Sequence, residues 1–208
     1  MDLTNVYIGF ALATFAGLST GIGSLLGLYS KFENKRLLSL ALGFSAGVMI
    51  YVSFMELLLL SFDSLGGLYG DTYGKLIGVT AFIAGLLIML FIDQLFDHHS
   101  IADFISRSSN KEESLLIRTG VFSAIALAIH NFPEGFATFT AAVYDPAVGA
   151  TLAIAIAIHN IPEGLAVSVP IYYATKSKSK AFWISFASGL AEPLGAVIGF
   201  LIFRTVYN

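Results

Sequence analysis

The sequence contains no cysteine and few charged residues. Without cysteine there are no disulfide bonds and no thiolate ligands for a metal. Lysine, arginine, aspartate and glutamate make up 12% of the 208 residues, about half of the roughly 25% that is usual in a soluble domain. Hydrophobic residues make up 56%. A soluble protein of this length cannot bury so much apolar surface, so the composition indicates an integral membrane protein and gives no sign of a nucleic-acid partner.

Six apolar runs are long enough to cross a bilayer, which takes roughly 20 residues. No lysine or arginine precedes the first run, and that run is too long for the core of a signal peptide, so we interpret it as a membrane helix. The runs are also too long and too uniformly apolar for the strands of a membrane barrel. The sequence therefore predicts an all-α, polytopic membrane helix bundle. Its six helices are expected at about 6–29, 37–61, 75–96, 112–143, 146–173 and 181–204.

The basic residues predict the orientation of these helices. Nine of the eleven lysines and arginines lie in or beside the first, third and fifth connections, and Lys75 and Arg204 are the exceptions. Because basic residues are enriched in cytoplasmic loops, loops 1–2, 3–4 and 5–6 are expected in the cytoplasm. The N-terminus is then outside, in the cell (inner) membrane. The nine residues are Lys31, Lys35, Arg36, Arg107, Lys111, Arg118, Lys176, Lys178 and Lys180.

One polar motif occurs twice inside apolar runs. "HNFPEG" begins at His130 in the fourth predicted helix, and "HNIPEG" begins at His159 in the fifth. The connection between these helices is a few residues long, so they are expected to form an antiparallel hairpin with both motifs near the bilayer midplane. Two copies of a motif on antiparallel neighbours predict inverted-repeat symmetry, which is typical of many secondary transporters with a site where the copies meet.

Each copy of the motif places metal ligands on one helix face. A histidine and a glutamate four residues apart lie one helical turn from each other, and the asparagine flanks the same face. Together the two copies offer two imidazoles, two carboxylates and two amides. Imidazole with carboxylate suits Zn²⁺, Fe²⁺ and similar divalent metals. The candidate ligands are His130, Asn131, Glu134, His159, Asn160 and Glu163.

Two further glutamates fall within predicted membrane helices. A charged side chain at the bilayer centre costs roughly 2.5–3.5 kcal/mol or more, so it is a candidate functional residue. Glu192 precedes a proline in "GLAEPLG", which echoes the main motif, and it could extend the site to a second ion. Three roles are open for Glu56: a ligand of the metal pathway, a proton carrier or a packing residue. A single buried histidine or glutamate is usually a packing feature, but the matched spacing here favours a metal site.

A fainter repeat links the first and last helices. Residues 16–27, "AGLSTGIGSLLG", are similar to residues 188–199, "SGLAEPLGAVIG". Three glycines and a leucine of the first segment recur at the same positions in the second. These two helices run in opposite directions, so the sixth helix is expected to open an inverted copy of helices 1–3, with two further helices after it.

The doubled HNxPEG motif, with "SGLAEPLGA" at 188–196, resembles the ZIP (Zrt-, Irt-like protein) family of divalent metal transporters. "LGFSAGVMIYVSFMEL" at 42–57 is similar to the bacterial ZupT-like branch of that family. The resemblance covers essentially the whole chain. It implies eight helices with both ends outside, so residues 1–208 are expected to be a single transmembrane ZIP-type domain that lacks the last two. It also implies an elevator-like motion, in which the first, fourth, fifth and sixth helices carry the metal.

The resemblance implies a two-metal centre between the fourth and fifth helices. One ion would be bound by the histidines and glutamates of the two motifs. The second would be bound by the two asparagines and Glu192, with the motif glutamates bridging both ions. Met49 and Glu56 match positions that line the pathway in relatives.

The predicted function is uptake of divalent metal into the cytoplasm by alternating access. Zn²⁺ is the expected substrate, with Fe²⁺, Mn²⁺, Co²⁺ and Cd²⁺ as further candidates, and the implied partners are the lipid bilayer and a second copy of the chain in a homodimer. An intramembrane metal-dependent enzyme, such as a protease, is the main alternative. It would need HExxH, in which a glutamate beside the first ligand activates water, whereas asparagine follows each histidine here. We therefore expect no enzyme activity; a passive metal channel stays open.

Two more histidines lie in the connection between the third and fourth helices. His98 and His99 follow Asp97, and family members often carry histidine-rich stretches at this place. Capture of metal and a short solvated loop are both open interpretations.

Overall fold

The computed structural model describes residues 2–29, 35–95 and 111–206. Residues 30–34 and 96–110 lie outside the described ranges. Two basic residues of the first and third connections, Lys31 and Arg107, therefore lie outside the described residues, as do His98 and His99.

Every element within those ranges is a helix, and six spans are long and apolar enough to cross a membrane. The expected all-α polytopic bundle is therefore confirmed. The helices are α1 (Leu3–Tyr29), α2 (Lys35–Tyr51), a π-helical turn η1 (Val52–Leu57), α3 (Leu58–Tyr69), α4 (Asp71–Leu95), α6 (Lys111–Tyr144), α7 (Pro146–Thr175), α8 (Lys178–Gly189) and α9 (Ala191–Val206).

The second membrane span is longer than the sequence predicted. It continues through the π-helical turn and α3 to Tyr69, where about 61 was expected. Gly70 then ends the helix with φ of 82°, a conformation that glycine adopts without steric cost. Because α4 begins at the next residue, α3 and α4 form a tight hairpin. These two helices and the end of α2 belong to one compact unit, Gly47–His99.

The sixth membrane span is two helices rather than one. α8 ends at Gly189 and α9 begins at Ala191, with Leu190 between them. Pro193 explains the break, since it has no N–H to donate to the carbonyl of Gly189 four residues earlier. The break places Glu192 in the first turn of α9.

α6 and α7 form the expected antiparallel hairpin. The carboxylate of Asp145 caps α7 by accepting a hydrogen bond from the backbone N–H of Ala147 at 2.8 Å, and Pro146 occupies the first helical position. Both helices continue through the proline of their HNxPEG motif. The motifs therefore lie near the middle of long helices, away from both ends.

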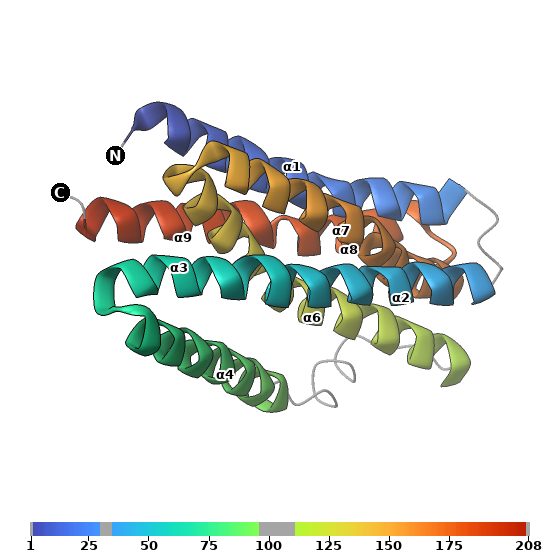
Figure 1. The fold of residues 1–208 in the computed structure, drawn as a ribbon. Coiled ribbons are helices and arrows are strands. Elements are labelled where there is room, and N and C mark those ends of the chain that lie inside the picture. Colours follow the sequence, from blue (N-terminus) through green and yellow to red (C-terminus); the bar gives the residue numbers. More distant parts are fainter. Residues whose placement is uncertain (1, 30–34, 96–110, 207–208) are drawn as a thin grey trace. The chain divides into compact units, whose positions relative to one another are not determined.

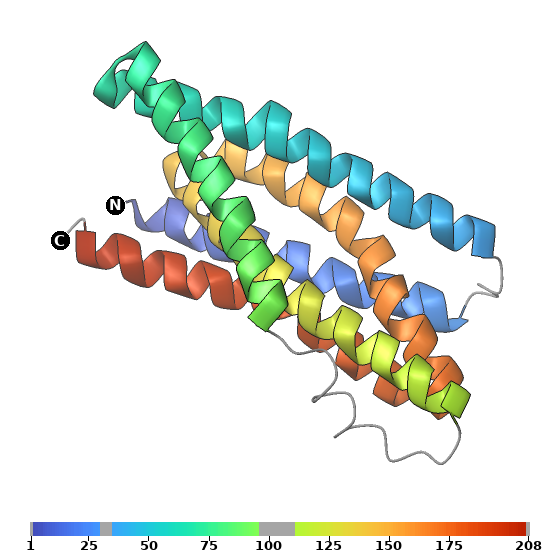
Figure 2. The same cartoon turned by 90° about the horizontal axis from the view of Figure 1, so that it is seen from below.

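The other compact unit comprises Met1–Ala46 and Ser100–Asn208, and it contains both motifs. In it α1 packs against α6, α7, α8 and α9, and α6 packs against α7 and α9. Figures 1 and 2 show α1 running beside α7 and beside α9, and in Figure 2 α1 lies between those two helices.

Glycines bring the helices of this unit into backbone contact. A Cβ added at Gly23 of α1 would overlap the carbonyl of Ile161 in α7. A Cβ at Gly195 of α9 would likewise overlap the carbonyl of Phe132 in α6. Only residues without a side chain permit such an approach, which is typical of helix packing in membranes.

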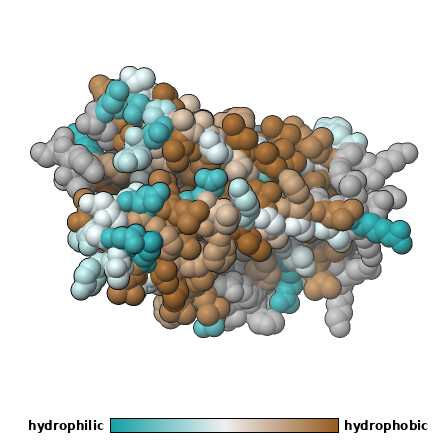
Figure 3. All heavy atoms as spheres, in the orientation of Figure 1, coloured by the Kyte–Doolittle hydropathy of each residue, from teal (hydrophilic) through white to brown (hydrophobic). Residues whose placement is uncertain are grey.

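Apolar side chains are exposed along most of the helices. Large hydrophobic residues such as Phe15, Ile22 and Leu86 are at least half exposed, and apolar residues cover most of the face in Figure 3. In water such a surface would drive aggregation, but it suits the hydrocarbon core of a bilayer.

We expect Gly23→Ala to destabilise the protein, because the new methyl group would collide with the α7 backbone. Overpacking of this kind typically costs about 1–3 kcal/mol. Thermal unfolding of the purified protein in detergent would measure the loss. Gly85→Ala in α4 is the matched control, since a Cβ there meets nothing within 4 Å. Equal unfolding temperatures for the two variants would contradict this account of the packing.

Candidate metal centre

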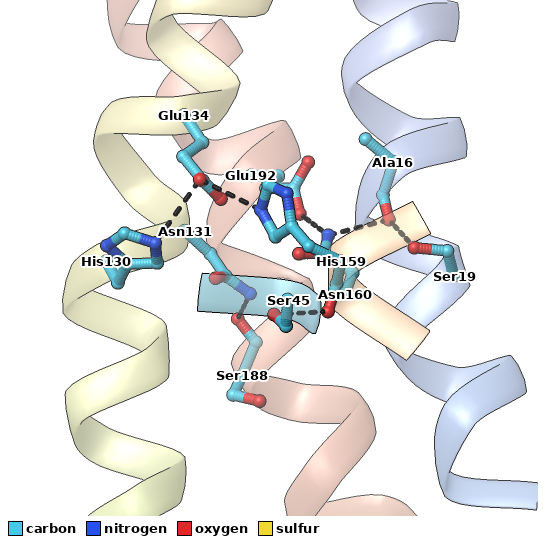
Figure 4. A network of polar contacts seen from close by, with 10 residues as sticks. All are labelled: Ala16, Ser19, Ser45, His130, Asn131, Glu134, His159, Asn160, Ser188 and Glu192. Atoms are coloured by element: carbon cyan, nitrogen blue, oxygen red, sulfur yellow. Dashed lines mark hydrogen bonds and ion pairs between the residues drawn. The ribbon is translucent and has the colours of Figure 1, made fainter. Parts of the chain in front are cut away.

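Glu134 joins the two motif histidines. Its Oε1 lies 3.3 Å from Nε2 of His130, one turn earlier on α6, and 3.1 Å from Nε2 of His159 on α7. One carboxylate oxygen thus faces an imidazole from each motif, as Figure 4 shows. The antiparallel hairpin brings the two helices together, and the spacing of four residues places both α6 groups on one face.

Glu163 completes the group of four. Ligand atoms of His130, His159 and Glu163 all lie within 4.8 Å of one another. The side chain of Glu163 is buried, and neither of its oxygens has a hydrogen-bond partner among the described residues. The two imidazoles and two carboxylates therefore converge on one place between α6 and α7.

The motif asparagines are tied to neighbouring helices. Asn131 Nδ2 donates to the carbonyl of Ser188 in α8 at 3.3 Å, and Asn160 Nδ2 donates to the carbonyl of Ala16 in α1 at 3.0 Å. Asn160 Nδ2 also donates to Oε1 of Glu192. These bonds use the amide nitrogens and leave both amide oxygens available. Figure 4 shows Glu192 beside the motif residues.

The group contains several buried acceptor atoms that no donor satisfies. Leaving a buried polar atom without a partner typically costs about 1–3 kcal/mol, and more for a charged group. A cation among these atoms would offset that cost for several of them at once. The atoms are Asn131 Oδ1, Glu134 Oε2, Asn160 Oδ1, both carboxylate oxygens of Glu163, Glu192 Oε2 and His159 Nδ1.

The donor set fits a divalent metal. Imidazole nitrogen and carboxylate oxygen together suit Zn²⁺, while the amide and carboxylate oxygens near Glu192 suit harder cations such as Mn²⁺. All seven candidate ligands predicted from the motifs and from "GLAEPLG" lie in the same compact unit. Met49 and Glu56 belong to the other unit. Glu56 lies in the π-helical turn with an exposed side chain, and a pathway role for these two residues stays a prediction.

Sequence reasoning missed the contacts that hold the site in place. Ser45 of α2 donates from Oγ to the carbonyl of His159 at 3.2 Å. The backbone carbonyls of Ala16 and Ser188 orient the two asparagines. Ser45 lies four residues before Met49 within the segment 42–57, but nothing about a lone serine distinguishes it as a contact of the centre. A backbone acceptor carries no signal in the sequence.

Comparison with known proteins decides the family. A family model described as ZIP Zinc transporter matches residues 105–207. The zinc transporter ZupT of Chlorobium chlorochromatii is 49% identical over 210 residues, which cover 98% of this chain and 78% of that protein. The chain belongs to the ZIP family. The zinc transporter ZupT of Oceanobacillus iheyensis is 48% identical, covering 99% of this chain and 80% of its own length. The zinc transporter ZupT of Clostridium perfringens is 44% identical, and the match covers 100% of this chain and 79% of that protein.

Both copies of the motif fall within the matched part of this ZIP chain, as does Glu192. The resemblance to ZIP proteins of the ZupT type, first drawn from the doubled HNxPEG motif and from "SGLAEPLGA", is thereby confirmed. The assignment of individual metal ligands in this ZIP chain stays a proposal based on the geometry described above.

Zn²⁺ is expected to stabilise the purified protein, because the ion would satisfy acceptors that the protein leaves unpaired. At about 100 times the dissociation constant the stabilisation is roughly 2.7 kcal/mol, visible as a raised unfolding temperature that a chelator reverses. Glu163→Gln should lose most of this shift. Asp63→Asn, which removes a carboxylate from the exposed residue Asp63 in α3, should keep it. A full shift in the Glu163 variant would argue against the centre.

Proposed function

We propose that this chain is a divalent metal uptake transporter that carries Zn²⁺ into the cytoplasm by alternating access. One observation supports this most directly: two imidazoles and three carboxylates meet inside membrane helices, and several of their acceptor atoms lack any partner within the part of the chain that the structure describes. Ionisable groups at that depth mark ion pathways. The name of the ZupT relatives, zinc transporter, agrees with this substrate.

Membership of a transporter family decides against the enzyme alternative. The geometry agrees, because Glu134 contacts both histidines and so acts as a member of the ligand group itself. A metalloenzyme would need a separate carboxylate placed to activate water. Fe²⁺, Mn²⁺, Co²⁺ and Cd²⁺ are further candidate substrates, since carboxylate and imidazole ligands accept several divalent metals.

The inverted-repeat hypothesis extends to helix packing. The contact of Gly23 with Ile161 has its counterpart in that of Gly195 with Phe132. In both pairs the glycine comes from the faint repeat and the carbonyl from the residue after the motif asparagine. We infer that the α1–α7 pair and the α9–α6 pair are two copies of one arrangement, with the metal centre where they meet.

For orientation we propose an outside N-terminus and cytoplasmic loops 1–2, 3–4 and 5–6. One contact supports placing two of these loops on the same side. Nζ of Lys178, at the start of α8, lies 4.1 Å from the ring centroid of Tyr29, at the end of α1. The basic residues of both connections then face the cytoplasm.

Labelling with a membrane-impermeant thiol reagent tests this orientation, because the chain has no cysteine of its own. Tyr144→Cys, at the exposed end of α6, is expected to be labelled in intact cells. Ser179→Cys, exposed in α8, is expected to react only after the membrane is permeabilised. The reverse pattern would show the opposite orientation.

Uptake into proteoliposomes tests the transport function. Zn²⁺ uptake by the unaltered chain should saturate with concentration and turn over slowly, as in a carrier; a rate that rises without saturation would favour a channel. Glu134→Ala and Glu163→Ala should each abolish uptake, since each removes a carboxylate from the ligand group. Asp71→Asn alters only an exposed ion pair with Lys75 and should transport normally. Normal uptake by either glutamate variant would refute the proposed site.

A further inference from the structure

The two motif asparagines make equivalent bonds in the two halves of the bundle. Asn160 donates to the carbonyl of Ala16, and Asn131 donates to the carbonyl of Ser188. Ala16 and Ser188 are the first residues of the two segments that form the faint sequence repeat. The sequence repeat and the two hydrogen bonds therefore align the same residues of one half of the bundle with those of the other half.

The same register equates Thr20 with Glu192, each being the fifth residue of its segment. The packing agrees. A Cβ at Gly164, the last residue of the second motif, would overlap the carbonyl of Thr20. A Cβ at Gly135, the last residue of the first motif, would overlap the carbonyl of Glu192. Thr20 thus has the place in one half that Glu192 has in the other.

The hydroxyl group of Thr20 is fully buried and has no hydrogen-bond partner in the described ranges of the chain. Threonines inside helices of this protein usually donate to the carbonyl four residues earlier, as Thr140 and Thr151 do. For Thr20 that carbonyl belongs to Ala16, which already accepts from Asn160 Nδ2 at 3.0 Å and from Ser19 Oγ at 2.5 Å. The usual acceptor is therefore occupied.

The position of Thr20 also relates it to the centre. Its Oγ1 would lie 2.9 Å from a Cβ at Gly189, the residue that follows the acceptor of Asn131. In the other half, Glu192 meets the amide of Asn160. By the same relation we infer that the hydroxyl of Thr20 faces the side of Asn131, whose Oδ1 is also buried without a partner among the described residues.

We propose that Thr20 is a further oxygen donor of the metal centre, the uncharged and shorter counterpart of Glu192. The inference rests on the proposed metal-transport function. With Asn131 it gives the centre a neutral oxygen side opposite the carboxylate side of Asn160 and Glu192. Neutral oxygen donors favour hard cations such as Mn²⁺, whereas the imidazole ligands favour Zn²⁺. Thr20 therefore adjusts which metals the centre accepts.

Metal binding to the purified full chain in detergent tests this proposal with Zn²⁺ and Mn²⁺ alone as probes. Thr20→Val keeps the shape of the side chain and removes the oxygen. We expect it to weaken Mn²⁺ binding on the order of tenfold and Zn²⁺ binding by clearly less, so the ratio of the two affinities changes. Thr20→Ser keeps the hydroxyl and should bind both metals like the unaltered chain.

Ser24→Ala is the matched control. Ser24 lies one turn further along α1, is fully buried and has an unpartnered hydroxyl, yet its counterpart in the repeat is already an alanine, Ala196. Its removal should leave both affinities unchanged. The proposal is overturned if Thr20→Val binds both metals as the unaltered chain does, or if the Thr20 and Ser24 variants lose affinity equally.

Thr20→Glu provides an independent readout. The new carboxylate at residue 20 should lower the unfolding temperature of the metal-free protein, because its buried charge then has no compensating partner. Mn²⁺ should restore it by a larger shift than in the unaltered chain. Destabilisation that metal does not reverse would place residue 20 away from the ion. Absence of Zn²⁺ uptake by the unaltered chain would instead refute the transport function, whatever the binding data show.

Discussion

The structure depends on carboxylates that are buried between membrane helices without enough donors to satisfy them. One oxygen of Glu134 contacts two histidines, and neither oxygen of Glu163 has a partner among the residues that the structure describes. Groups of this kind are costly to remove from water. The cost is tolerable where a divalent ion visits the site. It also limits the affinity, because the empty centre must remain folded between transport cycles.

The close packing of helix backbones makes this centre possible. The glycines that end both motifs, Gly135 and Gly164, bring α6 and α7 against the backbones of α9 and α1. At this separation an asparagine side chain reaches a backbone carbonyl of the neighbouring helix. The glycine of HNxPEG therefore permits the close helix packing on which the proposed metal centre depends.

The sequence predicted the helical class well, and it predicted which motif residues would lie close together, for physical reasons. Long apolar runs determine membrane helices because every backbone group must be bonded within the span. A spacing of four residues determines a shared helix face, which is why His130 and Glu134 could be paired in advance. The two glutamates of the motifs could be assigned to one group because a short connection forces the hairpin.

Other features depend on tertiary contacts that no local pattern encodes. The π-helical turn around Glu56 follows no residue type that marks such turns, and the second span continues past its expected end to Tyr69, although Asp63 interrupts the apolar run. The break at Leu190 could have been placed from Pro193, but Pro133 and Pro162 are in unbroken helices. The bond from Ser45 to a backbone carbonyl could not be predicted, since it depends on where α2 packs.

The break between α8 and α9 has an electrostatic consequence. A helix that begins inside the membrane carries the positive end of its dipole there. Glu192 lies in that first turn of α9. The dipole favours a negative charge at this place by about 0.3–1 kcal/mol or more where water is excluded. A continuous sixth helix would lack this field, so the interruption lowers the cost of ionising Glu192 in the hydrocarbon layer.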